Sequence, residues 1–221
     1  MSITPFYFPE LFSFSRILLA VSGGIDSMVM LHAIYHQFLS KNDLQNLWEK
    51  IFVITINHNI REKEESAGDA ELVQSWCIRH QITCKVEELA VGSVSSCAQM
   101  RKMGTEEAAR FLRYNTIYQY REEIKADCIC FAHNQNDQLE TLLQRTFQGS
   151  ILQSSIGIVQ QRQYIYRPLL PISRSQIISY AEKNQVPYRT DKTNFETDYF
   201  RNKIRHLLIP VLDTHFSGWD T

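Results

Sequence analysis

Residues 16–31 read RILLAVSGGIDSMVML, and this stretch decides the fold. Its first part, Arg16–Val21, is a short continuous apolar run of the kind that forms strands buried in parallel sheets. The residues from Met28 to Phe38 place apolar side chains at helical spacing. The stretch therefore predicts a strand, a tight Ser-Gly-Gly turn and a helix.

The turn between them suits a phosphate group. Gly23 and Gly24 have no Cβ, so the backbone can turn tightly and approach a ligand closely. The following helix directs its free backbone N–H groups and the positive end of its dipole at the same point. Ser22 and Ser27 add hydroxyl groups, and Ile25 contributes a further amide. We expect this turn to bind a pyrophosphate group.

Asp26 is the unusual member of this turn. A carboxylate beside bound phosphate repels it unless a cation lies between them, so Asp26 suggests a bridging Mg²⁺ ion. The turn lacks the Gly-Lys-Ser/Thr of a Walker A loop and the spacing of the dinucleotide Gly-x-Gly-x-x-Gly motif. A purely structural turn, capped by Ser or Asp, is the alternative interpretation.

Strand and helix patterns alternate along the rest of the chain. This alternation predicts an α/β fold, a parallel sheet with helices on both faces. The Ser-rich segment Ser93–Met103 predicts a polar loop. The predicted strands are Ile51–Ile56, Thr83–Glu87, Cys128–Ala132 and Tyr164–Leu170, and the predicted helices are Glu64–His80, Thr105–Lys125 and Asp137–Phe147.

The composition describes an ordinary globular chain. It has 221 residues, of which 44% are hydrophobic and 21% charged, which excludes a wholly disordered chain. No apolar run is long enough to span a membrane, and the first residues lack a secretory signal pattern, so we expect a cytoplasmic protein. The five cysteines include no Cys-x-x-Cys pair. Cys128 and Cys130 would point to the same face of a strand as small buried residues.

Charge is unevenly distributed. Residues 160–206 contain nine basic and four acidic side chains, a net charge of +5, whereas the whole chain carries −1. A solvated surface is one interpretation, and a face that binds anions or nucleic acid is the other.

Ser22–Ser27 (SGGIDS) resembles the pyrophosphate loop of the N-type ATP pyrophosphatases. This resemblance implies a Rossmann-like fold of the adenine nucleotide alpha hydrolase type, with ATP as substrate. Further segments resemble the bacterial tRNA(Ile)-lysidine synthases and occur in the same order. These segments are Glu106–Tyr114 (EEAARFLRY), Ala132–Thr141 (AHNQNDQLET), Arg167–Leu170 (RPLL), Asp191–Asn194 (DKTN) and Arg201–Arg205 (RNKIR).

Membership of that family implies a ligase that uses ATP and Mg²⁺. The wobble cytidine of an isoleucine tRNA with a CAU anticodon is adenylated at C2, with release of pyrophosphate. Free L-lysine then displaces AMP and forms lysidine, which changes decoding from AUG to AUA. A homodimer is compatible with the sequence, but no pattern in it argues for one.

The resemblance assigns catalytic roles to Asp26, His133 and Asp137. Asp26 would hold Mg²⁺, and His133 would contact the cytidine or the α-phosphate. Asp137 and Glu140 are three residues apart on one helix, so they share a face that could bind Mg²⁺ or the lysine ammonium, or supply a base. The alternative is a carboxylate favoured by the helix dipole beside a solvated Glu.

Basic residues complete the expected site. Arg110 and Arg113 share a helix face and would contact substrate or phosphate, although they also suit surface ion pairs with the neighbouring glutamates. Arg167, Arg201 and Arg205 would bind tRNA phosphates; Arg201 and Arg205 are spaced i, i+4 as a fork.

His58 follows a predicted strand, where it would line the adenine pocket or serve as an ordinary strand-end histidine. The resemblance implies a catalytic domain over residues 1–200. It also implies that residues 201–221 lie where a tRNA-binding region, absent here, would begin.

Two segments depart from the family pattern. His-His-x-Asp-Asp-Gln is replaced by His133-Asn134-Gln135-Asn136-Asp137-Gln138, and the usual Arg-Gly-x-Gly is reduced to Arg145–Gly149 (RTFQG). A degenerate protein that only binds ATP or tRNA is therefore an alternative. A tRNA thiolase is another, but those that modify cytidine typically use paired Cys-x-x-Cys motifs, which this chain lacks.

Overall fold

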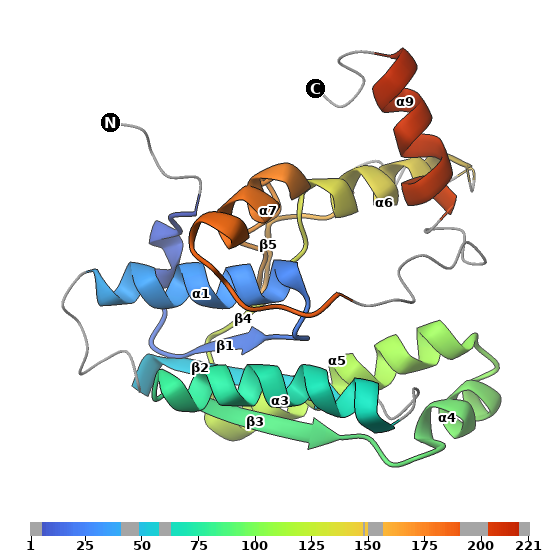
Figure 1. The fold of residues 1–221 in the computed structure, drawn as a ribbon. Helices are drawn as coiled ribbons and strands as arrows, with labels where there is room; N and C mark the ends of the chain where they lie inside the picture. Colours follow the sequence, from blue (N-terminus) through green and yellow to red (C-terminus); the bar gives the residue numbers. More distant parts are fainter. Residues whose placement is uncertain are drawn as a thin grey trace.

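The computed structural model describes residues 6–40, 49–57, 63–147, 149, 157–190 and 203–216. Its centre is a six-stranded sheet with the order β3-β2-β1-β4-β6-β5 (Figure 1). The strands are β1 (Ile17–Ala20), β2 (Ile51–Asn57), β3 (Thr83–Glu88), β4 (Cys128–Cys130), β5 (Gln161–Arg162) and β6 (Ile165–Tyr166). The helices are η1 (Pro9–Ser13), α1 (Ile25–Leu39), α3 (Lys63–Arg79), α4 (Ser93–Arg101), α5 (Thr105–Ile124), α6 (Gln135–Phe147), α7 (Arg174–Lys183), η3 (Ile204–Leu208) and α9 (Ile209–His215).

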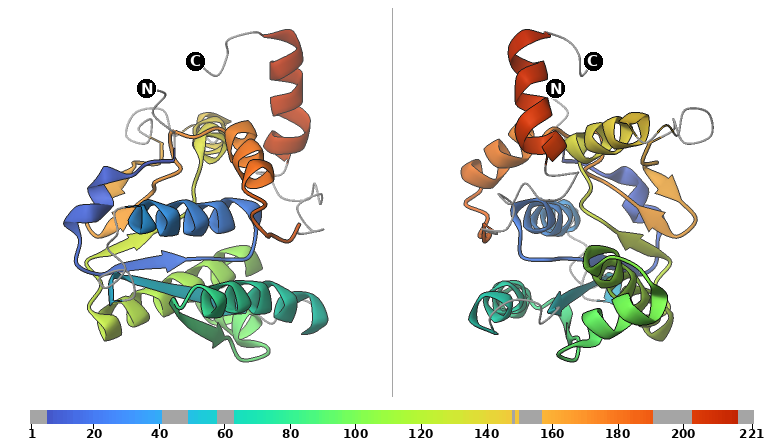
Figure 2. Two further views of the ribbon diagram at one scale, coloured as in Figure 1. Left: turned by 60° about the vertical axis from the view of Figure 1, so that its left-hand side comes forward. Right: turned by 90° about the vertical axis from the view of Figure 1, so that its right-hand side faces the viewer.

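Helices cover both faces of this sheet, as predicted. Successive strand residues point to opposite faces, so Ile17 and Leu19 of β1 join a core with α1, α3 and α7, whereas Leu18 joins a second core with α5. Figures 1 and 2 show α1 and α3 on one side of the sheet and α5 on the other. All pairings are parallel except that of β5 with β6.

The cysteines of β4 confirm the predicted strand geometry. Cys128 and Cys130 both face the core with α1, and Ile129 between them faces the core with α5. No cysteine among the described residues, which include all five, forms a disulfide.

Two expectations about local structure need correction. Ser93–Met103 is not a loop, because Ser93–Arg101 forms helix α4. Left-handed residues end it on both sides, Gly92 with φ 81° and Lys102 with φ 53°, and the guanidinium of Arg101 lies 3.8 Å from the Phe111 ring centroid of α5. Tertiary packing against α5 therefore decides the conformation of a segment whose composition suits a loop.

The predicted strand at 164–170 is much shorter than expected. Only Ile165–Tyr166 pairs with β4, since Pro168 follows closely and has no N–H to continue the ladder. Strand β5 (Gln161–Arg162) pairs antiparallel with β6, and the sequence did not predict this hairpin. No helix among the described residues is long and apolar enough to cross a membrane.

The chain's last described elements extend away from the sheet. Figure 2 shows α9 projecting beyond the body of the α/β layers. Leu207, Val211 and Phe216 of this region are exposed. The proposed division at residue 200 stays a prediction.

A group of aromatic and histidine side chains lies between α1, α3 and α7. The Nδ1 atom of His32 lies 3.1 Å from the hydroxyl of Tyr180, and its ring lies 4.2 Å from that of His36. Burial, followed by the charges of His36 and His80, lowers the pKa of His32 from 6.5 to about 4.

We predict that acidification from about pH 6.5 towards pH 4 lowers the free energy of unfolding through His32. In this window the unfolded chain binds a proton at His32 that the folded chain excludes. The free energy of unfolding therefore decreases as the pH is lowered. His32→Gln should flatten the pH slope of unfolding free energy, measured by urea denaturation, relative to its own value near pH 8, where the imidazole is neutral in both states. An unchanged slope in the variant would contradict this assignment.

Candidate active site

The site lies where β1 and β4 end. These strands are parallel neighbours, with Ile17 opposite Cys128 and Leu19 opposite Cys130. The turn after β1 and the segment after β4 therefore leave the sheet at the same edge. The strand order also reverses here, since β2 and β3 continue on one side of β1, and β4, β6 and β5 on the other. Open α/β sheets bind their ligands at such a point.

The glycine turn is braced from two directions. Gly23 has φ +83°, and a Cβ there would lie 3.0 Å from the carbonyl oxygen of Asp69, so a side chain would be strained both ways. The carbonyl of Gly23 accepts a hydrogen bond from the backbone N–H of Arg189, at 3.0 Å. The Nε atom of Arg189 in turn lies 2.9 Å from Oδ1 of Asp69. Residues from α3 and from the segment after α7 thus fix the turn.

The two serines of the turn have different environments. Ser27 is buried, and its hydroxyl donates to the carbonyl of Gly24 at 2.9 Å and accepts from the N–H of Ser22 at 3.1 Å. Ser22 is exposed. Ile25 is buried in the core, so its backbone amide, and not its side chain, is the group suited to a phosphate. Ser27 thus holds the turn together, whereas Ser22 is exposed at its surface.

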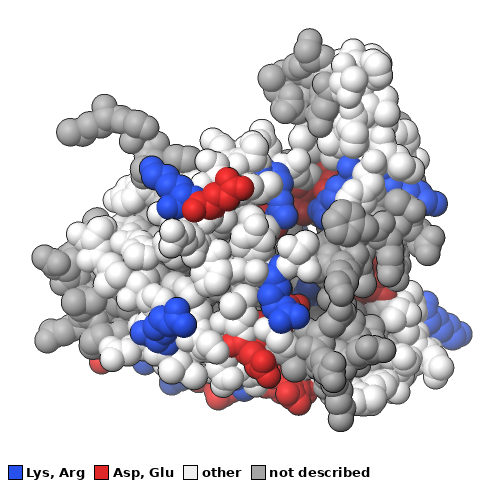
Figure 3. Space-filling model, in the orientation of Figure 1, with Lys and Arg blue, Asp and Glu red and all other residues white. Residues whose placement is uncertain are grey.

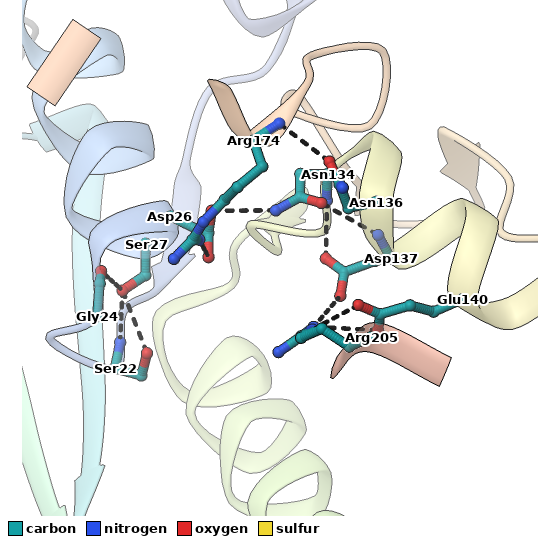
Figure 4. A network of polar contacts seen from close by, with 10 residues as sticks. All are labelled: Ser22, Gly24, Asp26, Ser27, Asn134, Asn136, Asp137, Glu140, Arg174 and Arg205. Atoms are coloured by element: carbon teal, nitrogen blue, oxygen red, sulfur yellow. Dashed lines mark hydrogen bonds and ion pairs between the residues drawn. The ribbon is translucent and has the colours of Figure 1, made fainter. Parts of the chain in front are cut away.

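Asp26 joins the turn to the segment after β4. Its Oδ1 atom accepts a hydrogen bond of 3.0 Å from the amide of Asn134, and its Oδ2 atom pairs with the guanidinium of Arg174 (Figure 4). Both carboxylate oxygens therefore face a donor from an element distant in sequence.

The two asparagines that depart from the family pattern have defined contacts. Asn134 is buried and exchanges two hydrogen bonds with Asp137: its N–H donates to Oδ2 at 2.9 Å, and its Oδ1 accepts from the Asp137 N–H at 3.1 Å. This reciprocal pair caps the start of α6. Asn136 accepts a bond of 3.0 Å from the backbone N–H of Arg174. The asparagines thus link α6 to both α1 and α7.

Glu140 and Arg205 form the innermost ion pair of the site. Glu140 is completely buried, and its two oxygens accept bonds of 2.6 Å from Nε and 3.0 Å from Nη2 of Arg205. The same Nη2 lies 3.8 Å from Oδ1 of Asp137. Burial lowers the pKa of Arg205, but the bonds to Glu140 and the charges of Asp137 and Asp26 outweigh it, so the pKa is raised.

The structure thus brings together several of the predicted residues. Asp137 and Glu140 share one face of α6, as expected, and Arg205 faces them (Figure 4). Arg205 therefore contacts carboxylates, whereas the sequence suggested that it binds phosphates together with Arg201. Arg201 and His58 lie outside the described residues.

Three other predicted residues lie close together: Arg110 and Arg113 belong to α5, and Arg167 lies near them. Nη2 of Arg110 donates to the Tyr114 hydroxyl at 3.1 Å, and Nη1 of Arg167 donates to the carbonyl of Val159 at 2.8 Å. Burial lowers the pKa of both Arg113 and Arg167, and the charge of Arg110 acts in the same direction. Such mutually repelling guanidinium groups favour binding of an anion.

His133 also turns towards this side. It directly precedes Asn134, and its ring centroid lies 6.1 Å from that of Phe131, a residue of the core with α5. It therefore lies next to Phe131 on the side of the sheet that α5 covers, and its catalytic role stays a prediction.

Sequence reasoning did not single out Arg174 or Arg189 for the site. Arg174 and Asn134 both contact Asp26, from which they are separated in the sequence by 148 and 108 residues. No local motif marks such partners, and the only signal was the excess of basic residues after position 160. Figure 3 shows basic side chains gathered beneath α9, with acidic ones among them.

The residues present fit a Mg²⁺ ion only together with phosphate. Among the described residues, no group of three or more His, Cys, Asp or Glu side chains could hold a metal ion. Mg²⁺ commonly takes one or two carboxylates and completes its shell with water and substrate phosphates. Asp26, beside the glycine turn, provides such a carboxylate.

We predict that Arg205→Met destabilises the fold by about 3 kcal/mol, because it leaves the buried Glu140 carboxylate uncompensated. Glu140→Gln should cost less, since it leaves a partly exposed arginine. Urea denaturation of both variants and of the double variant measures this. The double variant should be more stable than the sum of the single effects predicts, and additivity would contradict a coupled pair.

Comparisons with known proteins agree with this geometry. Residues 2–212 match the PP-loop domain family. The chain is 46% identical over 207 residues to the tRNA(Ile)-lysidine synthase of Treponema denticola, and 36% identical over 203 residues to that of Clostridium tetani. These matches cover 93% and 91% of this chain but only 43% and 41% of those proteins, so the chain spans less than half the length of these relatives.

The fold has solved counterparts of low sequence identity. The structure of the U34-tRNA thiolase of Methanococcus maripaludis, with its 4Fe–4S cluster, matches 91% of this chain and 67% of that chain, with a TM-score of 0.68 at 16% identity. This likeness concerns the fold alone. The match over residues 2–212, with the geometry at the ends of β1 and β4, shows that the chain belongs to the PP-loop domain family, within which its sequence is similar to the tRNA(Ile)-lysidine synthases.

Proposed function

We propose that this chain is the catalytic part of an enzyme that uses ATP to join lysine to C2 of the wobble cytidine in an isoleucine tRNA with a CAU anticodon. The observation that carries the proposal is the convergence of Asp26, Asp137 and Glu140 beside the braced glycine turn. The names of the relatives support the choice of tRNA and of lysidine as product. With tRNA as substrate, the enzyme would act in the cytoplasm.

The first step would use the glycine turn. The cytidine O2 attacks the α-phosphorus of ATP and pyrophosphate leaves. Ser22 and the first amides of α1 are placed to bind that leaving group. A Mg²⁺ ion, when bound at Asp26, would offset the charge of the phosphates. Arg110, Arg113 and Arg167 would bind tRNA or the α-phosphate, since they repel one another without an anion.

The second step would use the carboxylates of α6. The lysine amine attacks C2 and AMP leaves, so the ammonium group must first lose a proton. Asp137 would bind that ammonium or accept its proton. Glu140, whose two oxygens are held by Arg205, would help to orient Asp137 through that arginine. His133, which directly precedes Asn134, would contact the cytidine.

Two other readings are less well supported. A thiolase that modifies cytidine would typically use paired Cys-x-x-Cys motifs, which this sequence lacks, and three of its five cysteines (Cys77, Cys128 and Cys130) are buried. A protein that only binds ATP or tRNA was suggested by Asn134 and Asn136. Their hydrogen bonds to Asp26, Asp137 and Arg174 instead support an ordered site.

The first test is incorporation of radiolabelled lysine in the presence of ATP and Mg²⁺. We expect label on the isoleucine tRNA with a CAU anticodon and none on methionine tRNA, which shares the anticodon sequence. Because this chain spans less than half of its relatives, the longer relative from Treponema denticola is the positive control. If the chain bound ATP but attached no radiolabelled lysine to either tRNA, the result would favour a protein that only binds ATP or tRNA.

We predict that Asp26→Ala lowers tRNA-dependent pyrophosphate release by about 10²–10³-fold, the typical loss for one preorganised electrostatic group. Glu182→Ala, which removes an exposed carboxylate of α7, is the matched control and should leave the rate unchanged. Pyrophosphate release by Asp26→Ala at the rate of the unmodified chain would exclude the role proposed for this carboxylate.

A further inference from the structure

The backbone of Arg174 is firmly held at the edge of the site. Arg174 is the first residue of α7, directly after Ser173, whose hydroxyl and N–H form a capping box with Gln176. Its own N–H donates to Asn136 of α6 at 3.0 Å. Any change in the position of its guanidinium must therefore come from side-chain rotation, because the backbone is tied to two helices.

The side chain is held much less firmly than that of Arg205. Its guanidinium pairs with Oδ2 of Asp26, and the exposed fractions of the two side chains are 41% and 30%. Arg205 instead engages both oxygens of a fully buried carboxylate. Ion pairs exposed to this degree contribute little to stability, whereas a buried pair is far harder to break. Arg174 is thus the more easily displaced of these two arginines.

The charge of the site favours such an exchange. Around the glycine turn, the described residues pair Asp26 with Arg174, Asp69 with Arg189, and both Asp137 and Glu140 with Arg205. An incoming triphosphate would meet a carboxylate at Asp26. A guanidinium has five N–H donors in a planar fork that matches phosphate, and pairing with one carboxylate oxygen leaves donors for another anion.

We propose that Arg174 is a ligand of the β- and γ-phosphates of ATP. In the absence of nucleotide its guanidinium neutralises Asp26, and when ATP binds it rotates to the phosphates and releases Oδ2 for a Mg²⁺ ion. Figure 4 shows the side chain reaching from α7 to Asp26, beside the glycine turn. The inference rests on the proposed binding of ATP at that turn.

The test compares ATP with AMP, since AMP lacks the two phosphates concerned. Binding is measured by calorimetry without tRNA or lysine, once in EDTA and once with Mg²⁺. Arg174→Gln should weaken ATP binding about tenfold or more in EDTA, the typical loss of one hydrogen bond to a charged group, and leave AMP binding unchanged. Arg174→Lys, which keeps the charge, should recover part of the affinity. Lys183→Gln, at the other end of α7, controls for loss of a positive charge.

The Mg²⁺ series gives a second readout. With the competing guanidinium removed, Arg174→Gln should reach its full Mg²⁺ effect at a lower Mg²⁺ concentration than the unmodified chain. If the ion pair had a purely structural role, its loss would weaken the binding of ATP and of AMP equally, and that outcome overturns the inference. Unchanged ATP binding by Arg174→Gln overturns it as well and leaves the proposed function standing. Failure of the unmodified chain to bind ATP would overturn both.

Discussion

The parallel pairing of β1 with β4 is the constraint on which the site depends. It places the end of each strand at the same edge of the sheet, although more than a hundred residues separate them. Asp26 and Asn134 can meet only because this register is held by two cores, one on each face of the sheet. A slip by one residue would turn Leu18 and Ile129 towards the wrong core and separate the two groups.

The second organising feature is the graded strength of the ion pairs. Glu140 could not be buried as a carboxylate without the bidentate contact of Arg205, so this pair belongs to the permanent framework. The pair of Asp26 and Arg174 is exposed to solvent and easier to break. A site with one fixed and one exchangeable arginine can keep its shape while the charges of substrate and leaving group change.

The asparagines after β4 show how a substitution is absorbed locally. Asn134 and Asn136 stand where the pattern that this sequence resembles has a histidine and an aspartate, yet both make hydrogen bonds that order α6 and α7. An amide offers both a donor and an acceptor, so it can satisfy a carboxylate and a backbone N–H at once. The loss concerns titration and charge, because an amide cannot take up a proton at neutral pH.

The sequence by itself determined the α/β class, four of the strands, the glycine turn between β1 and α1, and the position of Asp137 and Glu140 on one face of a helix. Each of these follows from local periodicity or from residues a few positions apart. Only the tertiary structure decided that Ser93–Arg101 is a helix, that Arg174 pairs with Asp26, and that Arg205 pairs with Glu140. The reason is physical: these outcomes depend on packing and on charges brought together from distant elements, and nothing in a local pattern encodes which partner the fold will supply.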